Sequence, residues 1–259
     1  MRTLIYTCAD KKYSHWIPLY CLSILTFNKD VDIEIGMEGH LEPLEKEAVE
    51  YIRSQFPNSQ ILIKENFFTK IGEKKAFVES QNIKTLFVTV RFVTTPKLKA
   101  DYVYIGDVDI IILEPFVQQH LNNMEKLGLN YSNIVQLKNP QKMGMSGLHF
   151  SKWNAYYPLP NLSEIDLFKD DREILKDIIS LKGNHINLDA TFRPVHGIHF
   201  SKNRPTVKGD EKIPGWGADK YRKAWEVFSN TEQYKFVYEN TDESIKMMIK
   251  MLNDYYKNN

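Results

Sequence analysis

Three strand-like segments alternate with helical patterns in the first 64 residues, and this alternation restricts the fold more than any other feature. The expected strands cover residues 4–8, 31–35 and 60–64. Apolar residues at helical spacing predict helices from Ser14 or His15 to Asn28 and over residues 42–56. We therefore expect an α/β fold with a mostly parallel central sheet flanked by helices. Ligands of such sheets bind beyond the carboxyl ends of the strands.

Two acids interrupt the apolar segment 102–113, which is long enough for one buried strand. Asp107 and Asp109 stand one residue apart within it. An ionised carboxylate in such a run is costly unless it is paired or bound to a metal, so these acids indicate a strand end that opens onto a site. Mg²⁺ and Mn²⁺ take oxygen ligands from pairs of this kind, often together with substrate phosphates. The same pattern also occurs in surface turns without function.

Composition excludes several classes of protein. The 259 residues carry a formal net charge of +1, which does not favour a nucleic-acid-binding protein. Cys8 and Cys21 both lie in apolar surroundings, so buried reduced thiols are expected rather than a disulfide framework. The apolar segment at the N-terminus is too short for a signal peptide, and no run of about 18 apolar residues occurs. We expect a soluble, cytoplasmic protein.

An arginine and a pair of glycines are further candidates for a site. Arg91 lies in the apolar segment 85–93, which fits a helix or a strand, and a buried guanidinium there needs anions such as the two aspartates or a phosphate. The alternative is an arginine that extends to a surface carboxylate. In the predicted loop 139–147, Gly144 and Gly147 suggest close approach of the backbone to another group. A helix is expected over residues 165–181.

Two histidines stand close together in a short apolar segment near the C-terminal third. Either His196 or His199 could bind a metal, although a lone histidine more often only satisfies hydrogen bonds. Lys202 and Arg204 follow, and cations beside a metal ligand suit a diphosphate. A final basic amphipathic helix over residues 242–256 either packs on the body of the protein or contacts a membrane surface.

Short motifs spread over most of the chain complete the pattern. They are the segment 7–13, Arg91, Asp107-Val108-Asp109, Met145-Ser146-Gly147, the segment 171–175, His199-Phe200-Ser201, Arg204-Pro205 and Gly215-Trp216-Gly217-Ala218. In order and approximate spacing, these motifs resemble those of the family 8 glycosyltransferases with the nucleotide-sugar-dependent A fold. The similarity is greatest to bacterial lipooligosaccharide galactosyltransferases and glycogenin-like enzymes.

The resemblance implies a metal-dependent retaining transfer of a hexose from a UDP-sugar to a saccharide or lipid-linked saccharide in surface glycan (lipopolysaccharide) synthesis. It implies that Mn²⁺, or Mg²⁺, is held against the diphosphate. The resemblance assigns Asp107, Asp109 and His199 to the metal, with His196 as the alternative ligand, and Lys202 and Arg204 to the diphosphate. It assigns Cys8, Ala9, Asp10, Tyr13, Asp107 and Val108 to the nucleotide, Arg91, Ser146, Gly147 and Asp171 to the donor sugar, and Asp171, Arg172 and Arg91 to catalysis.

Some motifs depart from the family pattern. Ser146 stands where the family has the alanine of Asn-Ala-Gly, after Met145 in place of the asparagine amide, and Arg172-Glu173 replaces part of its Asp-Gln-Asp. The phosphate-binding motif lacks its glycine, and Arg204 comes one residue early. An arginine cannot act as a nucleophile, so donor preference can differ.

Residues 1–240 are interpreted as one catalytic domain and 241–259 as a C-terminal helix that packs on it or contacts the inner face of a membrane. Two other classes fit parts of the sequence. A haloacid-dehalogenase-like phosphatase would use Asp107 as nucleophile, but its acid pair normally ends an early strand, whereas three strand-like segments come first here. A non-catalytic nucleotide-sugar-binding module is the third hypothesis.

Overall fold

The central sheet has seven strands in the order β3-β2-β1-β4-β7-β6-β8. The structure, a computed structural model, describes residues 1–67, 86–135, 145–167, 169–185, 187, 191–192, 195–200, 206–208, 211–213 and 215–259. Only β7 runs against its neighbours β4 and β6, while the other four neighbouring pairs are parallel. The strands are β1 (Thr3–Ala9), β2 (Val31–Met37), β3 (Ile61–Lys64), β4 (Tyr102–Ile105), β6 (Tyr131–Val135), β7 (Met145–Lys152) and β8 (Thr191–Phe192).

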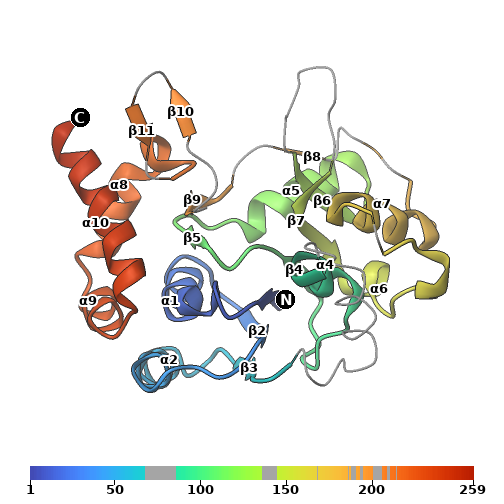
Figure 1. The fold of residues 1–259 in the computed structure, drawn as a ribbon. Helices are drawn as coiled ribbons and strands as arrows, with labels where there is room; N and C mark the ends of the chain where they lie inside the picture. The colour runs from blue at the N-terminus through green and yellow to red at the C-terminus, as the bar shows by residue number, and fades with distance from the viewer. Residues whose placement is uncertain are drawn as a thin grey trace.

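Helices cover both faces of this sheet, so the predicted α/β fold with a mostly parallel sheet is confirmed (Figure 1). Two small antiparallel sheets lie outside it, made by β5 (Ile110–Ile112) with β9 (Gly197–His199) and by β10 (Thr206–Lys208) with β11 (Glu211–Ile213). The helices are α1 (Ile17–Phe27), α2 (Pro43–Gln55), α4 (Leu86–Val93), α5 (Val117–Leu127), α6 (Trp153–Tyr156), α7 (Asp171–Leu181), α8 (Ala218–Ser229), α9 (Glu232–Glu239) and α10 (Glu243–Asn258), with 3₁₀ turns at Ser14–Trp16 and Leu162–Glu164.

The alternation of side chains along β1 divides the apolar interior into two layers. Ile5 packs with residues of α1, α2 and the C-terminal helices on one face. Leu4, Tyr6 and Cys8 pack with α4, α6 and α7 on the other. Because successive side chains of a strand point to opposite faces, a strand buried on both faces is mostly apolar, as β1 is apart from Thr3 and Thr7. Both cysteines are buried and free, as predicted.

Several sequence-based expectations need correction. The segment 102–113 forms two strands, because the chain leaves the main sheet after Ile105 and pairs with β9 from Ile110. The helix expected over 165–181 begins only at Asp171, whose predecessor Asp170 caps it by accepting a hydrogen bond from the backbone of Arg172. Residues 86–93 are helical. Met145 to Gly147, expected in a loop, begin strand β7, and residues 136–144 lie outside the described part of the chain.

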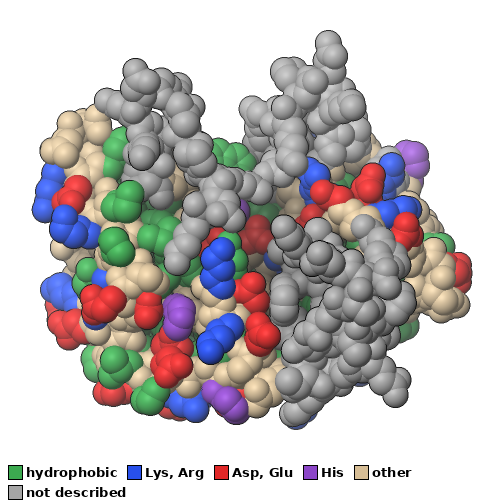
Figure 2. All heavy atoms as spheres, viewed as in Figure 1, with side chains coloured by type: hydrophobic (Ala, Val, Ile, Leu, Met, Phe, Trp, Pro, Cys, Tyr) green, Lys and Arg blue, Asp and Glu red, His purple; other side chains and the backbone are tan. Residues whose placement is uncertain are grey.

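The C-terminal helix α10 packs on the body of the protein through one apolar side. Ile245, Ile249 and Leu252 are buried in the same layer as α1 and α8. Two of its three lysines are paired with acids on the same helix: Lys246 Nζ lies 2.8 Å from Glu243 and Lys250 Nζ 2.6 Å from Asp254. Among the described helices, none combines the length and the apolar character that crossing a membrane requires. On the face shown in Figure 2, acidic and basic side chains are interspersed over the described surface.

Candidate metal and nucleotide site

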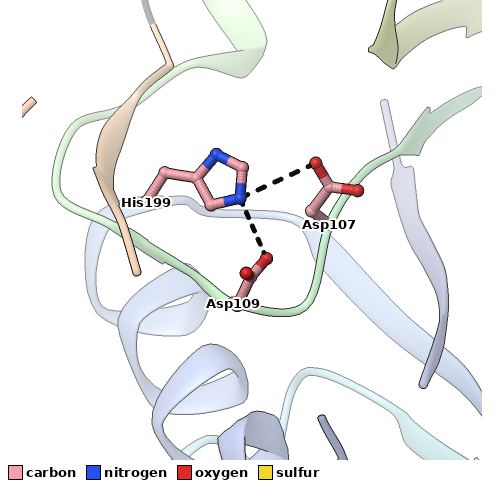
Figure 3. A group of neighbouring side chains, drawn as sticks. All are labelled: Asp107, Asp109 and His199. Carbon is pink, nitrogen blue, oxygen red and sulfur yellow. Dashed lines mark ion pairs between the residues drawn. The ribbon is translucent and has the colours of Figure 1, made fainter. Parts of the chain in front are cut away.

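The two acids of the segment 102–113 and one distant histidine come together at the end of β4. Asp107 and Asp109 lie on the loop that joins β4 to β5, and His199 ends β9 (Figure 3). Pairing of Ile110 with His199, and the hydrogen bond from Phe200 N to Asp109 O at 2.8 Å, hold the histidine beside the loop. One potential ligand atom from each of the three residues lies within 4.8 Å of the others.

Their distances suit a small divalent cation. His199 Nε2 lies 3.1 Å from Asp109 Oδ1 and 4.0 Å from Asp107 Oδ2. Octahedral ligands about 2.1 Å from an ion stand about 3.0 Å apart when adjacent and about 4.2 Å apart when opposite. The side chains of Asp109 and His199 are 8% and 9% exposed, whereas Asp107 is 26% exposed and is the candidate ligand nearest the solvent. Two carboxylates with one imidazole form a donor set that Mn²⁺ or Mg²⁺ accepts.

A buried guanidinium lies next to this triad. Arg91, on α4, places Nη1 2.6 Å from Asp107 Oδ1 and Nη2 3.7 Å from Asp171 Oδ2. Arg91 therefore has the anionic partners that a buried arginine was expected to need, and it does not extend to the surface. A Cβ atom on Gly147 would stand 2.6 Å from Nη2 of Arg91 and 3.1 Å from Oδ2 of Asp171. Glycine at this position of β7 thus leaves the space that the ion pair occupies.

The two adjacent carboxyls at the start of α7 have opposite properties. Burial raises the pKa of Asp171 from 3.8 to about 6, and Arg91 opposes that rise. The hydrogen bond from Arg172 holds the pKa of Asp170 well below its usual value. Arg172 approaches Asp170 at two points, Nε–Oδ1 at 2.5 Å and Nη2–Oδ2 at 2.7 Å. The guanidinium of Arg172 is therefore engaged at the helix cap, while Asp171 is the acid that faces Arg91.

The end of β1, with the residues expected to bind the nucleotide, adjoins the β4–β5 loop that carries Asp107 and Asp109. Thr7 Oγ1 donates a hydrogen bond of 2.7 Å to Gly106 O, one residue before Asp107. Asp10 Oδ1 accepts from the backbone N–H groups of residues 12 and 13 at 2.9 and 3.0 Å, which fixes the turn after β1. Burial raises the pKa of Asp10. Its Oδ2 has no hydrogen bond within the described residues and is available to a ligand.

Other nucleotide candidates differ in their exposure. Cys8 and Ala9 are buried, and burial raises the pKa of the Cys8 thiol to about 12, so it is a packing residue in its neutral form. Val108 is buried between the two metal acids. Tyr13 is half-buried and packs at the edge of the apolar layer beneath α1, with its ring 5.6 Å from Lys12 Nζ. Among the nucleotide candidates at the end of β1, Asp10 and Tyr13 are therefore partly exposed to solvent, whereas Cys8 and Ala9 are buried.

His196 lies in a separate buried network, which leaves His199 as the histidine of the metal triad. His196 Nδ1 is 2.8 Å from Glu114 Oε1, and its Nε2 is 3.1 Å from Nε2 of His120. Tyr221 OH donates to the same Glu114 oxygen at 2.7 Å. Burial lowers the pKa of His196. The pKa of Glu114 falls to about 2, because hydrogen bonds from His196 and Tyr221 outweigh the effect of burial. This network joins β9 to α5 and α8 behind the triad.

The remaining candidates are either internal or outside the described chain. Ser146 is buried, and its N–H donates to Asn133 Oδ1 at 2.8 Å, while its hydroxyl accepts from the N–H of Leu148 at 3.0 Å. Lys202 and Arg204, expected at the diphosphate, lie outside the described residues. Trp216 was noted only for its glycine neighbours. It is 37% exposed and exchanges backbone hydrogen bonds with His199 at 2.9 and 3.2 Å, which places it beside the metal triad.

Comparison with known proteins gives structural similarity without sequence similarity. No family model matches the chain, and no curated protein matches it. The chain is similar in structure to the glycosyltransferase GlyE of Streptococcus pneumoniae TIGR4, with 12% identity over 92% of this chain and 63% of GlyE and a TM-score of 0.47. The galactosyltransferase LgtC has 9% identity, 91% and 99% coverage and a TM-score of 0.49. The bifunctional glycosyltransferase WbbM has 14% identity over 93% of this chain and 51% of WbbM, with a TM-score of 0.41.

The chain thus spans less than two thirds of the length of GlyE and about half that of WbbM. At these identities and TM-scores, none of the three similarities determines what this chain binds or which reaction it catalyses. The function must be argued from the site itself. That site is a candidate divalent-metal centre at the carboxyl end of β4 in an α/β protein, flanked by a buried arginine and a carboxyl of raised pKa.

Proposed function

We propose that this protein is a metal-dependent retaining glycosyltransferase, which moves a hexose from a UDP-sugar to a saccharide or lipid-linked saccharide acceptor. The observation that carries the proposal is the meeting of Asp107, Asp109 and His199 at the carboxyl end of β4, next to the end of β1. In parallel sheets this edge is where ligands bind. Two carboxylates and one imidazole hold a divalent cation while leaving positions open for phosphate oxygens.

Each part of the site has a role in this reaction. Asp107, Asp109 and His199 would hold Mn²⁺ or Mg²⁺, which supplies electrostatic stabilisation to the negative charge that develops on the departing diphosphate. Lys202 and Arg204 are proposed to add positive charge there. Asp10 and Tyr13 would bind the uracil, with Cys8, Ala9 and Val108 forming the floor beneath the nucleotide through packing.

The donor sugar is proposed to lie against Arg91, Gly147 and Asp171. Asp171 orients the sugar hydroxyls by accepting hydrogen bonds, and Arg91 keeps Asp171 and Asp107 in place through its two ion pairs. Ser146 acts from within β7, where its hydrogen bond to Asn133 fixes the backbone that leads to Gly147. Arg172 positions Asp171 by holding the Asp170 cap of α7, and it does not touch the sugar.

Retention results when the acceptor hydroxyl attacks the anomeric carbon on the face from which UDP leaves, and we propose this route rather than a double displacement. The bond from the anomeric carbon to the phosphate oxygen breaks, the bond to the acceptor oxygen forms, and the hydroxyl proton passes to the leaving phosphate. In the phosphatase alternative, Asp107 would be the nucleophile. The ion pair with Arg91 at 2.6 Å disfavours this role, because it engages Oδ1 of Asp107 and lowers the nucleophilicity of that carboxylate.

Calorimetric titration of UDP, with and without Mn²⁺, tests the proposal. Binding should require the metal, and Asp109→Asn should weaken it by more than about tenfold, since loss of even an outer partner of a metal ligand costs about 10–100-fold. Asp254→Asn, on α10, is the matched control and should bind as the wild type does. Equal affinity without metal, or an unaffected Asp109→Asn variant, contradicts the proposal.

A second assay identifies the donor and separates a transferase from a binding module. The protein is incubated with Mn²⁺ and each of a panel of nucleotide sugars, and free UDP is measured. Release of UDP from one UDP-sugar, lost in Asp109→Asn, is the expected result. Metal-dependent binding of UDP without release from any sugar nucleotide, in the presence of a broad set of saccharide acceptors, would instead identify a non-catalytic module. The anomeric configuration of the product, read by proton NMR, tests retention.

A further inference from the structure

A second concave surface lies at the other end of strand β4 from Asp107, Asp109 and His199, the metal triad. The triad follows the last residue of β4, Ile105, whereas this groove surrounds the first, Tyr102, which pairs with Lys152 at the end of β7. Strand β4, Tyr102–Ile105, spans roughly 10 Å between the groove and the start of the loop that carries Asp107 and Asp109. In Figure 1, α6 and α7, whose ends border the groove, lie on the side of the sheet away from α8 and α10.

The lining of this groove is polar and built for hydroxyl-rich ligands. It encloses about 540 Å³, within the range of small-molecule sites. Its chemistry comes from three amides, two ammonium groups and one indole, supplied by Asn130, Asn154, Asn184, Lys152, Lys182 and Trp153. Amides both donate and accept hydrogen bonds, as sugar hydroxyls do, and the face of an indole packs against the C–H groups of a pyranose ring.

Bonds to the surrounding chain hold several of these groups in place. Asn184 Nδ2 donates to the carbonyl of Ala155, and Asn184 Oδ1 accepts from Asn130, each at 3.4 Å. Lys182 Nζ donates to the carbonyl of Pro158 at 3.0 Å. The ring of Trp153 packs on Tyr157 with centroids 4.6 Å apart. A ligand therefore meets side chains that are already ordered, which lowers the entropic cost of binding.

The charge of the groove favours an anionic ligand. Neither Lys152 nor Lys182 has an ion pair within the described residues, and two ammonium groups against one carboxylate leave the groove with a net positive charge. The one acid of the lining, Asp101, already accepts a hydrogen bond of 2.7 Å from the backbone N–H of Arg2. The indole N–H of Trp153 and the amide of Asn154 also have no hydrogen bonds among the residues described.

We propose that this groove is a second binding site of the protein, for a short oligosaccharide that carries an acidic group, either a carboxylate or a phosphate. The sugar ring stacks on Trp153, its hydroxyls bond the three asparagines, and its acidic group lies between Lys152 and Lys182. The groove binds its ligand independently of nucleotide and metal, because none of its lining residues belongs to the metal triad or the donor site.

The four tryptophans provide a test that reads the two sites separately. In a ¹H–¹⁵N spectrum of the full chain, the indole N–H of Trp153 reports on the groove and that of Trp216 on the metal triad. Trp16 and Trp225 are buried and serve as internal references. Trigalacturonate, 3′-sialyllactose and mannose 6-phosphate are titrated in the absence of metal, with maltotriose and lactose as neutral counterparts and tetraglutamate as a peptide anion.

At least one acidic saccharide should shift the Trp153 signal and leave that of Trp216 unchanged, with a weaker response to the neutral sugars. Lys152→Gln should weaken that binding about tenfold, as expected for loss of a charge-assisted hydrogen bond. Lys126→Gln, an exposed lysine of α5 outside the groove, is the matched control and should leave it unchanged. The proposal is overturned if no acidic saccharide shifts Trp153, if tetraglutamate does so equally well, or if Lys152→Gln has no effect. UDP with Mg²⁺ should shift Trp216 and leave Trp153 unchanged, so the transferase proposal succeeds or fails separately.

Discussion

Asp171 should destabilise the folded protein when it is ionised, and the effect should depend on pH with a defined sign. Burial raises the pKa of its carboxyl from 3.8 in the unfolded chain to about 6 in the folded one. Between these values, the folded protein holds a proton that the unfolded chain has released. The free energy of unfolding therefore falls as pH rises from about 4 to 6, and the whole penalty is present above pH 6.

The size of this penalty follows from the shift. A rise of about two pKa units, at about 1.4 kcal/mol per unit, corresponds to about 3 kcal/mol. Asp171 is 20% exposed, so little of this is lost to solvent screening. Asp171→Asn keeps the shape of the side chain and cannot ionise. Relative to the wild type, the variant should therefore gain about 3 kcal/mol of stability between pH 4 and pH 7.

Urea unfolding of both proteins in the presence of EDTA, at each pH from 4 to 8, measures this difference. The buried imidazoles of His120, His149 and His196, whose pKa values are lowered mainly by burial, also make stability depend on pH here, because the unfolded chain binds protons at these residues near pH 6.5. They are common to both proteins, so their contribution cancels in the difference. A difference that is constant from pH 4 to pH 7, or one that falls as pH rises, would refute the assignment of a raised pKa to Asp171.

Asp170→Asn is the matched control because the neighbouring carboxyl has the opposite shift. Arg172 holds the pKa of Asp170 well below its usual value, so the stability that Asp170 contributes is present above pH 3.8 and is lost only in stronger acid. The Asp170→Asn variant should therefore be less stable than the wild type, by an amount that changes little between pH 5 and pH 7. Opposite behaviour of two adjacent aspartates cannot come from a general effect of net charge.

Two further substitutions test how the site is held. In Gly197→Ala, the new Cβ would lie 1.8 Å from Ile111 O, so β9 must separate from β5. We expect the free energy of unfolding, measured in urea, to fall by more than about 3 kcal/mol, and Mn²⁺ binding, measured by calorimetry, to be lost. Unchanged metal affinity would contradict the pairing of β9 with β5. Glu34 is fully buried and accepts hydrogen bonds from the N–H groups of Lys97 and Leu98 at 2.7–2.8 Å. Glu34→Ala should lower the free energy of unfolding by about 3–5 kcal/mol in the same assay. A decrease below about 1 kcal/mol would show that this buried carboxylate does not anchor the loop before β4.

Much of the fold followed from local patterns of the sequence. The first three strands and the helices between them appear where the apolar periodicity placed them, because each element has its own period and its own end signals, such as Asn28 and Pro57. The prediction that a buried Arg91 needs anions such as the two aspartates is confirmed for Asp107, which forms an ion pair with Arg91. The end of α7 at Leu181 was also predicted, and Gly183, with a φ of +73°, follows it.

Other features could not be read from the chain. The sequence could not show that the segment 102–113 divides between two sheets, because a strand that changes partners keeps the same apolar pattern. Helix α7 was predicted six residues too long, since residues 165–170 have polar and apolar residues that also fit a helix. The choice between His196 and His199 depended on which ring faced Glu114 and which faced Asp109.

The sequence by itself determined the class of fold, the two acids of the candidate metal site and the need of Arg91 for anions, because periodicity and the cost of a buried charge act on neighbouring residues. The tertiary structure decided which distant side chains meet: His199 with the acids, and Asp171 with Arg91. The groove around Trp153 also exists only in three dimensions, since its lining comes from four separate segments of the chain. Contacts of this kind depend on strand order and register, which local patterns leave open.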